Sequence, residues 1–352
     1  MKRLAKLSIA AGACVASVGL VDTASVVHAA SVVTVTRFDD PAPGPCATSG
    51  TGSCSLREAV IFANAHNGTT VNLPAGAYVL SRSGADSAAM SGDLDIHADT
   101  AINGAGPEAT TISGGNLDRV FDVYPPSQST STVVSIGGVT VKKGLATDGF
   151  GGGGIWVGDG AGLTLTHAVV EQNGTIDHQG GGIMSRGPTT HLTLIESTVR
   201  VNNAYTTGQP GLDARGGGIA VEDSSVTIDR SAVVENVATA APGGASNSQI
   251  GGGDTEGGGV WASGAATVTI LNSVVATNTA NAGPGNPGPG SEATGGNAWG
   301  GGLAGSFTGG RFTVVNTTIT ATGPSAAQER PVNTAPADSA PVVGSTVTSP
   351  RR

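Results

Sequence analysis

A glycine-led motif that recurs five times constrains the fold of this chain more than any other feature of its sequence. Each copy begins with three glycines and an aliphatic residue, and an apolar-Thr-apolar triplet follows seven to nine residues later. A small residue, an aliphatic residue and an asparagine come three, five and eight positions after the triplet, although Thr322 replaces the last asparagine. The copies occupy residues 152–173, 180–202, 216–236, 257–278 and 300–322.

The pattern within each copy predicts short strands, because successive side chains of a strand point to opposite faces. One copy cannot bury its apolar face alone, whereas a stack of copies buries a continuous core. We therefore predict an all-β fold, a right-handed parallel β-helix, with ladders of aliphatic side chains inside it. A β-propeller is the structural alternative, although its repeats are usually longer and carry four strands.

The recurring asparagine indicates a structural corner. Side-chain amides at one position of every coil can each donate a hydrogen bond to the next, and asparagine tolerates the left-handed backbone of a tight turn. The asparagines of this column are Asn173, Asn202, Asn236 and Asn278.

Composition excludes several other classes of protein. The 57 glycines exclude an all-α fold, because glycine destabilises helix interiors. A hydrophobic share of 38% is too high for a wholly disordered chain. The formal net charge of -9 argues against a nucleic-acid partner, because neutralising phosphates needs clustered Lys and Arg.

Residues 1–29 have the features of a secretory signal peptide. Basic residues within the first six positions and an apolar stretch at 7–21 are followed by small residues that end at Ala29. No second apolar run reaches the ~18 residues of a membrane helix, so we expect no transmembrane segment in the mature chain. The expected location is outside the cell or on its surface.

Cys46 and Cys54 remain in the mature chain and predict one disulfide. They lie eight positions apart, and an even number of cysteines is typical of disulfide pairing in an exported protein. Closing this loop would stabilise the fold by about 2–3 kcal/mol. Two free thiols are the alternative, whereas no second Cys or His pair follows at the spacing of a zinc site.

Residues 30–66 are expected to cap the stack, whose open end would expose unpaired strand edges. Ser55 and Glu58 have the spacing of a helix capping box, which predicts a short capping helix. Its apolar face would consist of Leu56, Ala59, Val60 and Ala63. The β-helix is expected over residues 67–322, and residues 323–352, rich in Pro, Ser, Ala and Thr, predict a disordered low-complexity tail.

Residues 32–80 resemble the CSLREA N-terminal domain of exported bacterial β-helix proteins. The match includes Cys46, the Cys-Ser-Leu-Arg-Glu-Ala segment at 54–59 and the extended segment at 71–80 with its Leu-Pro-Ala-Gly sequence. The downstream glycine and asparagine repeats are similar to those of polymorphic outer-membrane proteins, with valine in place of phenylalanine. These resemblances imply a β-helix and export. Because the polymorphic proteins act as surface adhesins, the second resemblance also implies adhesion.

The long insertions all fall between the corner asparagine and the next glycine run, so they predict loops along one edge of the stack, here called the loop-rich edge. They occupy residues 174–179, 203–215, 237–256 and 279–299. Loops on one face of a rigid scaffold are where binding usually occurs. The partner we expect is an extracellular polysaccharide or a host or envelope surface component, and loops without a ligand are the alternative.

An acidic or amide residue stands shortly before each glycine run of this edge. These residues are Asp148, Asp177, Asp213, Asp254 and Asn297. In one interpretation, each accepts hydrogen bonds from the backbone of its glycine turn, and no cofactor is required. In the other, the four stacked carboxylates bind calcium, which prefers oxygen ligands.

Together these features favour a non-catalytic, monomeric, exported protein that adheres or binds glycans through the loop-rich edge. The first alternative is a carbohydrate-active enzyme, a polysaccharide lyase or depolymerase, since Ile176-Asp177-His178 matches a lyase tripeptide. Arginines that could supply a base or bind a carboxylate are Arg186, Arg200, Arg215 and Arg230. No carboxylate cluster recurs with them in the sequence, so we assign no catalytic residue. The second alternative is a structural envelope protein.

Overall fold

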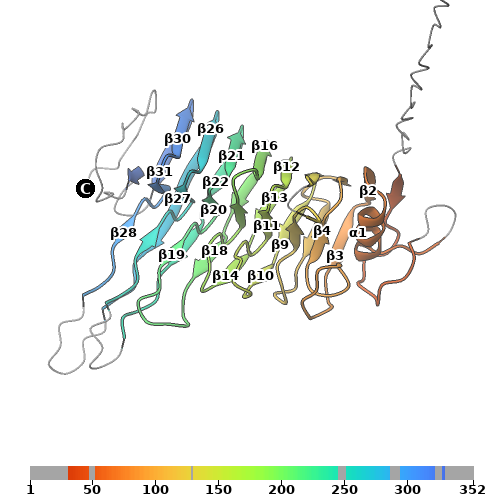
Figure 1. Cartoon of the computed structure of the whole chain (residues 1–352), viewed down its shortest axis with the longest axis horizontal. Coiled ribbons are helices and arrows are strands. Elements are labelled where there is room, and N and C mark those ends of the chain that lie inside the picture. Colours follow the sequence, from red (N-terminus) through yellow and green to blue (C-terminus); the bar gives the residue numbers. More distant parts are fainter. Residues whose placement is uncertain are drawn as a thin grey trace, which may run out of the picture.

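The computed structural model describes residues 31–46, 52–127, 130–244, 251–285, 294–321 and 327–329. In these residues the chain is all-β apart from one helix, as predicted, and its strands pair in parallel. Strands lie side by side along the long axis of the molecule, from β2 near one end to β30 near the other (Figure 1). The predicted signal peptide lies outside the described residues.

Three sheets of the described residues, with nine, eight and twelve strands, run along most of the stack. The nine-stranded sheet contains β1 (Val32–Thr34), β2 (Thr69–Leu73), β5 (Thr100–Gly104), β8 (Val133–Gly137), β12 (Gly162–Thr166), β16 (His191–Ile195), β21 (Ser225–Asp229), β26 (Thr267–Leu271) and β30 (Arg311–Val315). The eight-stranded sheet contains β4 (Leu94–Ile96), β7 (Phe121–Val123), β11 (Ile155–Gly158), β15 (Ile183–Arg186), β20 (Ile219–Glu222), β25 (Val260–Gly264), β29 (Leu303–Phe307) and β32 (Ala327–Glu329).

The remaining described strands form a larger and a smaller sheet. The twelve-stranded sheet contains β3 (Gly76–Val79), β6 (Thr110–Ser113), β9 (Thr140–Lys142), β10 (Leu145–Ala146), β13 (Val169–Glu171), β14 (Gly174–Ile176), β17 (Thr198–Arg200), β18 (Asn203–Tyr205), β22 (Ala232–Val234), β23 (Val237–Thr239), β27 (Val274–Asn281) and β31 (Thr318–Ala321). The three-stranded sheet contains β19 (Ala214–Arg215), β24 (Thr255–Glu256) and β28 (Ala298–Trp299).

Successive motif copies lie in register with one another. The chain passes from β12 through β13 and β14 to β15, and β16 then returns to the nine-stranded sheet beside β12. Leu163 of β12 pairs with Leu192 of β16, which pairs with Val226 of β21. These side chains are buried in a core that continues through the stack, as the aliphatic positions of the motif predicted.

The asparagine column forms the predicted amide stack. The side-chain Nδ2 of Asn202 donates to Oδ1 of Asn236 at 2.9 Å, and the backbone N–H of Asn173 donates to Oδ1 of Asn202 at 3.0 Å. Asn278 accepts the same two bonds from Asn236. All four asparagines are buried, so each coil corner is tied to the next through the interior.

The left-handed backbone, however, lies one position before the asparagine and not on it. Gln172, Val201, Glu235 and Thr277 have φ between 54° and 58°. The asparagine amide must point inward to reach the next coil, so the preceding, outward-facing residue makes the left-handed turn.

In the first four glycine runs, the asparagine stack leaves no room for a side chain at the last glycine. A Cβ added at Gly218 would lie 2.9 Å from Cγ of Asn236 and 2.7 Å from the carbonyl oxygen of Gly259. Such distances are shorter than real Cβ contacts. The same packing contact therefore requires glycine in the run and asparagine in the column.

The N-terminal region contains the predicted cap. Helix α1 (Leu56–Ala65) begins with a complete capping box, in which Ser55 accepts from the Glu58 N–H and the Glu58 carboxylate accepts from the Ser55 N–H. The helix contacts β2 and β4 at one end of the stack (Figure 1). Cys46 and Cys54 form the predicted disulfide.

Two findings refine the expected boundaries. The predicted loops begin with strand residues, in β14, β18, β23 and the end of β27. Short strands β19, β24 and β28 also lie inside these loops and pair in register immediately before the glycine runs. Within the predicted tail, Ala327–Glu329 form β32, which pairs with β29, so the tail is not irregular at these three residues. The rest of residues 323–352 lies outside the described part of the chain.

Candidate functional site

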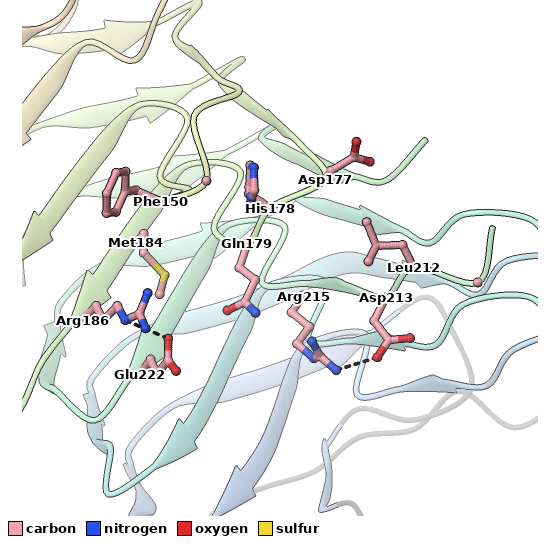
Figure 2. Close-up of a pocket in the computed structure, with 12 residues that line it drawn as sticks. Phe150, Asp177, His178, Gln179, Met184, Arg186, Leu212, Asp213, Arg215 and Glu222 are labelled. Carbon is pink, nitrogen blue, oxygen red and sulfur yellow. Dashed lines mark hydrogen bonds and ion pairs between the residues drawn. The ribbon is translucent and has the colours of Figure 1, made fainter. Parts of the chain in front are cut away.

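A cleft of about 260 Å³ lies beside the loop-rich edge, over the outer face of the eight-stranded sheet (Figure 2). Strands β15, β19 and β20 supply part of its wall, and the segments before β11, β15 and β19 supply the rest. Its lining residues are Gly149, Phe150, Asp177, His178, Gln179, Met184, Arg186, Gly211, Leu212, Asp213, Arg215 and Glu222. The cleft therefore joins residues from three consecutive coils.

An apolar strip passes under the cleft. Met184 pairs in register with Trp156 of the preceding coil and with Ala220 of the next, and Trp261 follows Ala220. These side chains face away from the main core and form a cluster of their own, yet none is more than 6% exposed. Neighbouring coils contribute different side chains to this column, in contrast to the uniform asparagine column.

The strand residues beside this strip form an ion pair across neighbouring coils. Arg186 and Glu222 pair in register on β15 and β20, and their Nε and Oε2 atoms are 3.2 Å apart. The Arg186 side chain is 51% exposed and that of Glu222 is 33% exposed. Figure 2 shows the two side chains together on one side of the cleft.

The second arginine of the cleft has two acidic neighbours and an aromatic one. A terminal nitrogen of Arg215 lies 2.6 Å from Asp213 Oδ2, and its Nε lies 3.8 Å from Glu256 Oε1. Its guanidinium carbon lies 5.4 Å from the centre of the Trp261 ring, within the range of a cation–π contact. Trp261 Nε1 in turn donates to Glu256 Oε2 at 2.8 Å. This network fixes the position of Arg215.

Phe150 forms an exposed aromatic wall of the cleft. Its side chain is 54% exposed, and its ring lies edge-on to Trp156 with centroids 5.8 Å apart. Arg119 holds the segment that carries Phe150, because it pairs with the Asp148 carboxylate and donates to the carbonyl oxygen of Gly151 at 2.8 Å. A buried arginine from the preceding coil thus positions the aromatic ring.

Five aspartates surround Arg119 and form what we call the acid cluster. Its members are Asp93, Asp95, Asp118, Asp122 and Asp148. Arg119 Nε is 2.8 Å from Asp93 Oδ2, and Asp95 pairs in register with Asp122 on the outer face of the eight-stranded sheet. Sequence reasoning found no such cluster, because its members are supplied by separate coils.

Burial changes the acidity of this cluster. It raises the pKa of Asp93 to about 9, reinforced by the negative charge of Asp122, although Arg119 opposes the shift. Burial likewise raises the pKa of Asp122 to about 7 and moves those of Asp95 and Asp118 upward. Asp93 is therefore protonated near neutral pH, where Asp122 changes between its protonated and its ionised form.

Only part of the predicted aspartate column is linked by hydrogen bonds from one member to the next. Asp213 Oδ1 accepts from the Asp254 N–H, and Asp254 Oδ1 accepts from the Asn297 N–H, both at 2.8 Å. Asp177 accepts from the N–H groups of the next coil, whereas Asp148 turns toward Arg119. None of these donors belongs to the glycine run that each residue precedes, and the 3.4 Å bond from the Phe150 N–H to Asp148 also comes from outside that run.

Calcium binding by Asp148, Asp177, Asp213 and Asp254 stays a prediction. Within the described ranges, no group of three or more His, Cys, Asp or Glu side chains is arranged to hold a metal ion. The contacts just described commit at least one oxygen of each aspartate to a backbone N–H or to an arginine.

Only two of the four arginines that the sequence analysis considered lie at the cleft. Arg186 and Arg215 line the cleft, while Arg200 pairs with Glu171 on the twelve-stranded sheet and Arg230 pairs with Glu196 elsewhere. Sequence reasoning missed Phe150, Gln179, Met184 and Glu222. The sequence held a signal for Met184, which follows the aliphatic position of its glycine motif. The residue at this position changes from tryptophan to methionine, alanine and tryptophan along a repeat that is otherwise constant.

No family model, no curated protein and no solved structure matches this chain. In the part of the chain that is described, no helix is both long enough and apolar enough to cross a membrane. The geometry of the cleft and of the acid cluster therefore carries the functional argument.

Proposed function

We propose that this chain is an exported, right-handed parallel β-helix that binds a glycan without catalysis, through the cleft beside its loop-rich edge. The observation that carries the proposal is the cleft itself, where an exposed Phe150 ring faces hydrogen-bonding side chains on a rigid sheet. Sugar-binding sites need an apolar surface for the ring and polar groups for the hydroxyls. Parallel sheets built from in-register coils support the β-helix.

The N-terminal region supports export to the cell surface or beyond. Disulfides such as Cys46–Cys54 persist in oxidising compartments and are rare in the cytosol. Residues 32–80 resemble the CSLREA domain of exported proteins, and the glycine motif resembles repeats of surface adhesins. We propose on this basis that the protein presents its cleft to extracellular or envelope polysaccharide.

The test is a glycan array followed by calorimetry on the folded, disulfide-bonded protein. Replacement of Phe150 by Ala removes the exposed ring and is expected to weaken binding about tenfold or more, since aromatic anchors contribute strongly to recognition. Phe38→Ala is the matched control, because Phe38 is 48% exposed but does not line the cleft. Equal affinity of the wild type and Phe150→Ala would place the binding surface elsewhere, and an array without any bound glycan would favour a structural envelope role.

The acid cluster favours a second candidate, a carbohydrate-active depolymerase. Glycoside hydrolysis uses one carboxyl group that is protonated and one that is ionised. Asp93 and Asp122 have raised pKa values beside other aspartates, which supports such a pairing. Release of reducing ends from a polysaccharide bound by the protein, lost in Asp122→Asn, would establish this activity in place of simple binding.

A further inference from the structure

The cationic groups of the cleft are already paired, which restricts the ligands that it can bind. Glu222 holds Arg186, and both Asp213 and Glu256 lie against Arg215. A guanidinium that is bonded to a carboxylate has little net charge left for an anionic ligand. A uronate or sulfate group entering the cleft would meet the carboxylates that already lie against these arginines.

Negative charge exceeds positive charge around the cleft. Asp177 adds a third lining carboxylate, and the N–H groups of Gly208 and Thr207 lower its pKa, so it is ionised at neutral pH. The charged lining residues are Asp177, Asp213, Glu222, Arg186 and Arg215, which leaves one net negative charge with His178 neutral. Buried Glu256 behind Arg215 adds another. An anionic ligand would therefore meet repulsion.

Uncharged groups of the cleft add contacts that suit a sugar. Gln179 contributes a buried carboxamide oxygen that has no hydrogen-bond partner in the described structure, and it can accept a bond from a hydroxyl group. Phe150 presents its exposed ring, and Met184 lies in the floor. A hydrogen-bond acceptor and two apolar side chains in one cleft suit the hydroxyl groups and the C–H face of a pyranose.

We infer that the cleft recognises an uncharged glycan and discriminates against uronic-acid and sulfated polysaccharides. This inference rests on the proposed glycan-binding function and specifies its ligand class. Discrimination arises because the arginine–carboxylate pairs offer hydrogen bonds to hydroxyl groups while they cancel the charge that an anion would need.

The test compares ligands of matched length on the full folded chain by calorimetry at 0.15 M ionic strength. The probes are oligosaccharides of glucose, mannose and N-acetylglucosamine, oligogalacturonate, a heparin oligosaccharide and the cationic glucosamine oligomer. At least one neutral probe is expected to bind about tenfold more tightly than either acidic probe. Tighter binding of an acidic or cationic probe would overturn the inference and keep the proposed function, whereas binding of none would overturn both.

Variants that remove the carboxylate partner of a cleft arginine test the inference more directly. Glu222→Gln frees Arg186 and is expected to raise the affinity for oligogalacturonate, relative to that for the neutral probe, about threefold or more. Asp213→Asn frees Arg215 in the same way and can still accept from the Asp254 N–H, so it serves if Glu222→Gln folds poorly. Glu171→Gln, which frees Arg200 on another sheet, is the matched control. An unchanged affinity ratio in both cleft variants would show that their pairing does not set the specificity.

Discussion

The asparagine corner and the outer face of the eight-stranded sheet are both columns of equivalent positions, but they follow opposite rules. At the corner, Asn173 to Asn278 repeat one residue type, and neighbouring asparagines in the column are hydrogen-bonded to each other. On the outer face, the column changes from Asp122 to Trp156, Met184 and Ala220. A position whose partner is the next coil must keep its residue, whereas a position that faces loops or ligand can vary.

The largest expected effect comes from placing a side chain in the uniform corner. Gly218→Ala puts a methyl group against Asn236 and Gly259, so we expect the free energy of unfolding to fall by about 3 kcal/mol or more. Chemical denaturation measures it. Gly162→Ala is the control, since its Cβ would meet nothing closer than 3.9 Å. Equal stability of the two variants would contradict our account of the glycine runs.

A somewhat smaller loss is expected from Asn202→Ala. The change removes the Oδ1 atom that accepts from Asn173 and the Nδ2 donor to the carbonyl oxygen of Val170, and it leaves these buried groups without partners. We expect the free energy of unfolding to fall by about 2–4 kcal/mol. Asn203→Ala, at an exposed position, should change it by no more than about 0.5 kcal/mol. If only Asn203→Ala lowered the free energy of unfolding, the buried asparagine stack would not be what stabilises the corner.

The acid cluster predicts an effect that depends on pH, and the informative quantity is the slope of the free energy of unfolding against pH. Because burial raises the pKa of Asp93 to about 9, the folded protein holds a proton that the unfolded chain loses near pH 4. The contribution of this group to the free energy of unfolding is fully present below pH 4. It is lost as the pH rises to 9, by at most about 1.4 kcal/mol per pH unit. Asp93→Asn should flatten this decline.

The measurement is the free energy of unfolding at several values between pH 5 and pH 9. Asp159→Asn, at an exposed aspartate outside the acid cluster, is the control and should keep the wild-type slope. If the free energy of unfolding of Asp93→Asn fell with pH as steeply as that of the wild type, Asp93 would ionise in the folded state without cost.

Much of the fold was predictable because it depends on contacts between equivalent residues. The spacing of Leu163, Leu192 and Val226 within the motif predicted their register, and Ser55 with Glu58 predicted the capping helix. The position of the left-handed turn was wrong by one residue, since the sequence does not show that the asparagine amide must face inward. The right-handed coil, the export signal and the calcium site stay predictions.

The candidate site was less predictable because the residue types at its positions change from coil to coil. Phe150, Met184 and Glu222 come from different coils, and only the stacking of β15 beside β20 brings Met184 and Glu222 together. Arg119 and Asp148 lie 29 positions apart, yet their ion pair positions the aromatic wall.

The sequence by itself determined the repeat, the parallel strands, the amide stack, the cap and the disulfide, because in each case the interacting residues are neighbours or exact repeats along the chain. Only the tertiary structure decided which arginines face the cleft, that carboxylates neutralise them, and that five aspartates share one arginine. Charges from separate coils combine in space, and neither their sum nor their burial can be read from the spacing of a repeat.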